Sequence, residues 1–190
     1  VYEWVQIGNQ VWMAENLAYL PEMKNSFNSS DTDPYYYVYG YFGFDMEEAM
    51  EDPDYESYGV LYNYPASLDA CPAGWRLPTL AEEQKLVENI GGESESASLI
   101  EVGNEHWSNN TSGTNGAGFT ARGAGRVDIV NGETRFREQR LMTGYWMADT
   151  CSVGAGNGLP FTLRQGDPFT ISDDQCRPFE SGYSIRCVKE

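Results

Sequence analysis

Positive charge is scarce in this sequence. Its 190 residues include 12 Lys and Arg against 29 Asp and Glu, for a formal net charge of −17. A surface this acidic repels phosphate groups, which excludes nucleic acid as a partner and disfavours anionic membrane surfaces. The acidity is compatible with a calcium site, which needs carboxylates clustered in a suitable geometry, and equally with solubility alone.

Histidine is almost absent, and no cysteines are closely paired. The only histidine is His106, and the four cysteines include no CxxC pair, which excludes a zinc ribbon or a thioredoxin-type site. We interpret His106 as structural, because it lies in a polar loop beside Trp107. No nucleophile, metalloprotease or phosphate-binding motif occurs in a fitting context. We therefore expect no enzyme and no cofactor, although the many carboxylates leave open a hydrolase acting on an extracellular polymer.

Long apolar runs are missing as well. No stretch approaches the ~20 residues that a membrane-spanning helix needs, so no such helix is predicted. An even number of well-separated cysteines favours two disulfides and an oxidising compartment. The chain begins at Val1 rather than Met, so we expect that a leader, such as that of a lipoprotein, has preceded it. The predicted location is extracellular or on the outer cell surface.

The residues that are abundant predict one α+β domain over 1–190, with short strands and many loops. Hydrophobic residues make up 41%, which can form a core, and there are 20 Gly. Turn signals at Gly8-Asn9 and Asn131-Gly132 predict hairpins over 1–12 and 127–136. Further strands are expected at 144–148, 161–163 and 183–188.

Helix signals lie in the first half. A short helix is expected at 63–70, and Thr79 with Glu82 forms a capping box ahead of a second helix that Gly91-Gly92 ends. One or two helical turns are expected at 45–50, ended by Asp52-Pro53. Another short helix is expected at 94–101. The core is expected to hold Trp12, Trp75 and Trp146.

Four segments, in order along almost the whole chain, resemble the Fibrobacter succinogenes major paralogous domain, a family of bacterial surface proteins. They are the segments 7–17, 58–62, 71–79 and 184–189, the third reading Cys-Pro-Ala-Gly-Trp-Arg-Leu-Pro-Thr. The resemblance implies a C-type-lectin-like fold, with two short helices, a twisted antiparallel sheet, long loops and the disulfides Cys71–Cys187 and Cys151–Cys176. Residues 18–58 interrupt these segments and are interpreted as an insertion.

The insertion contains an unusual aromatic run from Tyr35 to Phe44. Tyrosine rings stack on sugars and supply a hydroxyl, so the insertion is predicted to carry the ligand-binding residues. The opposite possibility, that the tyrosines pack the insertion onto the domain, stays open. The candidate binding residues are Tyr35, Tyr36, Tyr37, Tyr39 and Tyr41. If they bind, deleting residues 24–56 should leave a folded domain.

A calcium site of the lectin type has little support, because the ligand triplets of sugar-binding C-type lectins are missing. Asp173 and Asp174 are the nearest candidate metal ligands in the equivalent region. The predicted function is a secreted, surface-associated bacterial module that binds a glycan or a protein, in adhesion for example, without catalysis. A polymer hydrolase and a purely structural surface module are the alternatives.

Overall fold

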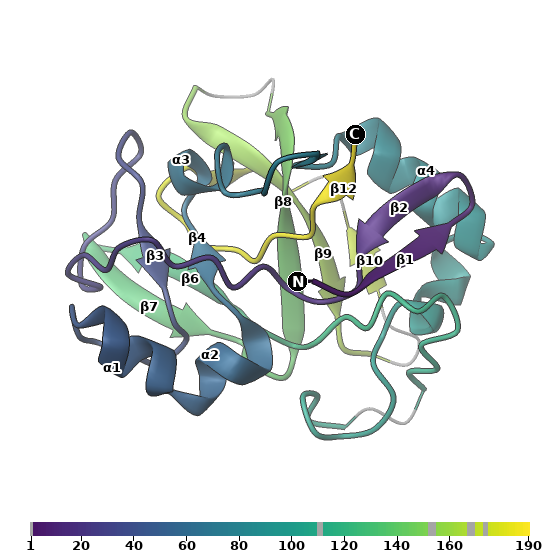
Figure 1. Cartoon of the computed structure of the whole chain (residues 1–190), viewed down its shortest axis with the longest axis horizontal. Coiled ribbons are helices and arrows are strands. Elements are labelled where there is room, and N and C mark those ends of the chain that lie inside the picture. Colours follow the sequence, from purple (N-terminus) through teal and green to yellow (C-terminus); the bar gives the residue numbers. More distant parts are fainter. Residues whose placement is uncertain (1, 110–111, 152–154, 167–169, 173–174) are drawn as a thin grey trace.

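The fold is α+β, with short helices and several small antiparallel sheets (Figure 1). The computed structural model describes residues 2–109, 112–151, 155–166, 170–172 and 175–190, and only the backbone of 170–172. One sheet has the strand order β1-β2-β12-β5 and is built from Trp4–Ile7, Gln10–Met13, Val188–Lys189 and Trp75–Arg76. It joins the two ends of the chain, because β12 pairs with β2.

The second half of the chain is mainly β, as predicted. Strand β8 pairs with β9, and β10 and β11 pair with the same strand; their bounds are Met142–Thr150, Asn157–Arg164, Thr170–Ser172 and Arg177–Pro178. Strands β6 (Arg126–Val130) and β7 (Glu133–Arg137) form the predicted hairpin. Both turn residues, Asn131 and Gly132, have positive φ, as a tight hairpin turn requires.

The C-terminal strand predicted at 183–188 is only partly formed. Strand β12 is limited to Val188–Lys189, while Tyr183 and Ser184 make isolated bridges to Tyr62 and Tyr145. The segment thus runs between β4 and β8 and is covered on both sides. It carries Tyr183, Ile185 and Cys187 into the largest hydrophobic cluster of the described residues.

Residues 18–58, which the sequence analysis interprets as an insertion, pack against the rest of the chain. Strand β3 (Tyr36–Tyr37) pairs with β4 (Leu61–Tyr62), and helices α1 (Met46–Glu51) and α2 (Pro53–Tyr58) follow each other directly. The helical turns expected at 45–50 do end at Asp52, as predicted, but a second helix that was not predicted begins at Pro53. Pro53 stands in the first turn of α2, where its missing N–H costs nothing, and the Asp52 carboxylate accepts the Asp54 N–H at 2.8 Å.

The capping box at Thr79 and Glu82 is confirmed, and it starts helix α4 (Leu80–Ile90). Gly91 ends that helix in the left-handed conformation. The Arg76 guanidinium and the Thr79 donors lower the pKa of Glu82 to about 2. The other helical segments are α3 (Tyr64–Ser67) and the 3₁₀ segment η1 (Glu93–Ser98), which lie where short helices were expected.

Replacing Thr79 with alanine is expected to lower the free energy of unfolding by about 1 kcal/mol, because the Glu82 N–H loses its side-chain acceptor. The Thr79 hydroxyl accepts the Glu82 N–H at 3.3 Å, and the Glu82 carboxylate accepts the Thr79 N–H at 2.9 Å. Urea denaturation measures the change. Thr79→Ser, which keeps the oxygen, is the control, and an unchanged midpoint for Thr79→Ala would contradict the prediction.

Both predicted disulfides are present. Cys71 pairs with Cys187 and closes 116 residues, and Cys151 pairs with Cys176 and closes 25. Two disulfides are typical of proteins outside the reducing cytosol. Trp12 and Trp146 are buried as expected. Trp75 is only partly buried, because it stands in β5 at the edge of its sheet.

Candidate functional site

A polar cleft of about 110 Å³ lies between the family-like segment after β2 and the insertion. Its polar lining comes from both sides: Glu15 and Asn16 belong to the first segment, and Glu56 and Ser57 to helix α2. Arg122 lines it from a third part of the chain. Three tyrosines, Tyr2, Tyr55 and Tyr58, are also among the lining residues.

Asn16 links the cleft to the core. Its amide donates to the Tyr58 carbonyl at 2.9 Å, and its oxygen accepts from Arg186 Nε at 2.9 Å. Asn16 is buried, so these bonds fix the cleft wall. Gly59 follows Tyr58 with φ +72°, and a Cβ there would lie 2.7 Å from the Leu17 carbonyl oxygen. Glycine is therefore needed where α2 returns to the scaffold.

Arg186 is a fully buried cation beneath the cleft. Its guanidinium donates to the carbonyls of Met13 at 3.1 Å, Thr120 at 2.9 Å and Phe119. It also lies 4.7 Å from the ring centre of Phe119. Burial lowers the pKa of Arg186, but a guanidinium stays charged at neutral pH. Carbonyl dipoles and aromatic faces thus solvate this cation, and its role is structural.

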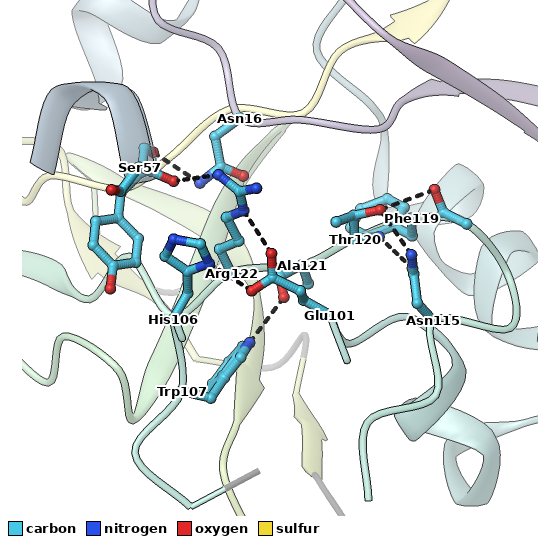
Figure 2. A network of polar contacts seen from close by, with 12 residues as sticks. Asn16, Ser57, Glu101, His106, Trp107, Asn115, Phe119, Thr120, Ala121 and Arg122 are labelled. Atoms are coloured by element: carbon cyan, nitrogen blue, oxygen red, sulfur yellow. Dashed lines mark hydrogen bonds and ion pairs between the residues drawn. The ribbon is translucent and has the colours of Figure 1, made fainter. Parts of the chain in front are cut away.

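A second polar group is formed by Arg122, Glu101 and His106, and it is less buried than the Arg186 group (Figure 2). Glu101 accepts from Arg122 Nε at 2.9 Å, and its other oxygen lies 2.6 Å from His106 Nδ1. Arg122 also donates to the Ser57 carbonyl at 2.9 Å, which ties the scaffold to the insertion. The Arg122 side chain is 36% exposed, whereas His106 is buried. Arg122 therefore presents an oriented guanidinium to the cleft.

His106 is more buried than the polar loop position that the sequence indicated. Its ring meets Tyr58 edge to face, with centroids 5.3 Å apart. Burial raises the pKa of Tyr58 to about 12, so its hydroxyl is neutral at physiological pH. Trp107 is buried beside it and donates to the Ala121 carbonyl at 2.9 Å.

The five candidate tyrosines occupy different environments. Tyr36 and Tyr37 are buried in β3, and burial raises the pKa of both. Their rings pack the insertion onto the domain and cannot reach a ligand in solvent. Tyr35, Tyr39 and Tyr41 are partly exposed, and their binding role stays a prediction.

The candidate calcium ligands Asp173 and Asp174 lie outside the described residues. Within the part of the chain that is described, no three His, Cys, Asp or Glu side chains are grouped so that they could hold a metal ion. The same part contains no helix long and apolar enough to cross a membrane.

The cleft was not predicted from the sequence. Arg122 and Thr120 carry no motif, and they meet Asn16 and Ser57 only through tertiary contacts. The available signal was the pair of family-like segments 7–17 and 58–62, which the structure brings together at the bond from Val60 N to the Leu17 carbonyl.

These features define an α+β fold with short helices, small antiparallel sheets and two disulfides. The family model described as the Fibrobacter succinogenes major domain matches residues 5–189, so the chain belongs to that family. Comparison with curated proteins and with solved structures found no match.

Proposed function

We propose that this domain is an extracellular, surface-associated bacterial module with a C-type-lectin-like fold that binds a glycan without catalysis. The observation that carries the proposal is the composition of the cleft. Arg122 supplies N–H donors, Glu15 and Glu56 supply carboxylate acceptors, and three tyrosines line the same cleft. A sugar hydroxyl both donates and accepts, and a sugar ring stacks on an aromatic face.

The size of the cleft favours the end of a glycan. Sites that enclose a drug-sized ligand occupy roughly 300–1,000 Å³. A volume of about 110 Å³ accommodates one edge of a single sugar ring. The remainder of the chain would extend over the surface.

The ion pairs beside the cleft favour binding over hydrolysis. Glu101 is the carboxylate held closest to histidine, and its two oxygens face Arg122 and His106. Both carboxylate oxygens of Glu101 are thus engaged within the protein, which suits a structural contact better than a general acid. The exposed Glu15 and Glu56 are better suited as hydrogen-bond acceptors than as a catalytic pair.

Replacing Glu56 with alanine is expected to weaken glycan binding by roughly tenfold or more, since a hydrogen bond to a charged group contributes about 1.5–3 kcal/mol. A glycan array, run with and without Ca²⁺, identifies the ligand, and calorimetry then compares the variants. Glu56 is exposed on α2, so the fold should not change.

Glu51→Ala is the matched control, because Glu51 is an exposed carboxylate of the insertion outside the cleft. It should bind like the unmodified domain. If Glu56→Ala binds the glycan as tightly as the unmodified domain, the binding site lies elsewhere. If the domain binds no glycan on the array, a protein ligand or a purely structural module is favoured instead.

A further inference from the structure

Exposed phenylalanine and methionine side chains are concentrated in residues 27–50, and none of them lines the cleft. Phe44 is 78% exposed, Phe27 54% and Phe42 48%, and Met46 and Met50 on α1 are exposed as well. We call these five residues the Phe–Met face. Figure 1 shows α1 at the opposite end of the long axis from α4. Grouped apolar side chains in water mark interaction sites, whereas single ones need no explanation.

The rings are held in place rather than loosely displayed. Phe27 stacks on Phe42 with centroids 5.2 Å apart, and Phe42 meets Phe136 of β7 at 5.1 Å. The buried Ser26 hydroxyl donates to the Gly43 carbonyl at 3.1 Å, which joins the two loops that carry these rings. A surface that is ordered before binding loses less entropy when a partner docks.

The charge on helix α1, which carries Met46 and Met50, has one sign. Helix α1 has the sequence MEEAME and contains no basic residue. Glu47 and Glu51 stand one turn apart, an arrangement that destabilises a helix. Among the described residues, no ion pair involves α1; its only carboxylate with a side-chain partner is Glu48, which accepts from the Tyr41 hydroxyl at 2.7 Å. A cationic partner would relieve this repulsion.

We infer that the Phe–Met face docks a polypeptide that presents lysine or arginine together with apolar side chains. Phenylalanine and methionine lack the polar groups that orient a sugar, while flexible methionines adapt to varied apolar partners. A second copy of this chain is disfavoured, because each copy has a formal net charge of −17. This inference is independent of the proposed glycan site, since none of the five residues lines the cleft.

The test uses two synthetic amphipathic helices of one length, one of leucine and lysine and one of leucine and glutamate. Calorimetry at about 0.1 M salt should detect binding of the lysine peptide alone. Raising the salt to about 0.5 M should weaken it, because the electrostatic part is screened. Phe42→Ser with Phe44→Ser should reduce the affinity by about tenfold or more, as loss of anchor residues does.

Glu47→Gln with Glu51→Gln should weaken binding and its salt dependence while keeping the apolar residues. Val102→Ser is the control, since Val102 is exposed outside the face. Equal binding of both peptides would overturn the inference in favour of non-specific apolar contact. The inference also fails if the lysine peptide does not bind, or if the phenylalanine variant binds it normally. Sedimentation that shows the Phe–Met face joining two copies of the chain would overturn it as well.

Discussion

Replacement of Arg186 by leucine is expected to destabilise the domain by about 3–5 kcal/mol, the range seen when one partner of a buried charged contact is removed. Arg186 is 1% exposed. Its loss would leave the carbonyls of Met13, Phe119 and Thr120 and the side chain of Asn16 without a buried donor. Each unsatisfied buried acceptor costs about 1–3 kcal/mol. The total loss of stability is smaller than these costs added together, because the structure relaxes or water enters.

Chemical denaturation of the oxidised protein measures this effect. Arg135→Leu is the matched control, because Arg135 is an exposed arginine that pairs with Glu133 on the same hairpin strand. Surface pairs contribute about 0–1 kcal/mol, so this variant should unfold near the original midpoint. Arg186→Lys should remain destabilised, because an ammonium cannot reach carbonyls on separate segments. Similar midpoints for both leucine variants would contradict the structural role of Arg186.

Local signals in the sequence were sufficient for the turns and caps. Asn131-Gly132 and the Thr79–Glu82 box were identified because each depends on residues within one turn of each other. Helix α2 was missed because Asp52-Pro53 can end one helix and also begin the next. Whether a new helix begins there depends on whether the residues after Pro53 can pack against the rest of the chain. Tyr58 packs against His106.

The candidate site was less predictable than the fold. The tyrosine run was recognised, but composition does not show which rings face inward. The pairing of β3 with β4 determines which rings face inward, and it joins residues 24 and 26 positions apart. The cleft depends on contacts of still longer range, such as Arg122 with Ser57. Polar residues without a motif give no signal until the fold brings them together.

Deleting residues 24–56 is now expected to abolish cooperative folding, contrary to the expectation of an independent scaffold. The segment contributes Tyr36, Tyr37, Val38 and Ala49 to the core. Its removal would expose the apolar side chains beneath them and leave β4 without β3. Burial of one large apolar side chain stabilises by about 1.5–3 kcal/mol, and a whole domain is stable by only about 5–15 kcal/mol.

A single substitution tests the same point without a deletion. Tyr37→Ala should cost about 3–5 kcal/mol, the range for removing a buried aromatic ring. The ring of Tyr37 is fully buried, and its hydroxyl donates to the Asn28 carbonyl at 3.1 Å. Tyr41→Ala is the control, because Tyr41 is partly exposed and contacts the exposed Glu48; it should cost less than about 1 kcal/mol.

Thermal melts of Tyr37→Ala, Tyr41→Ala and the deletion variant show whether the insertion is part of the core or a separable binding element. If Tyr37→Ala and the deletion melt like the parent domain, the insertion is a separable binding element. If only Tyr41→Ala is tolerated, the insertion has two layers. The inner layer completes the core through β3, and the outer layer, with the Phe–Met face and the α2 wall of the cleft, remains free to vary. Because the outer layer rests on the inner one, binding residues there can change while Tyr36 and Tyr37 must stay.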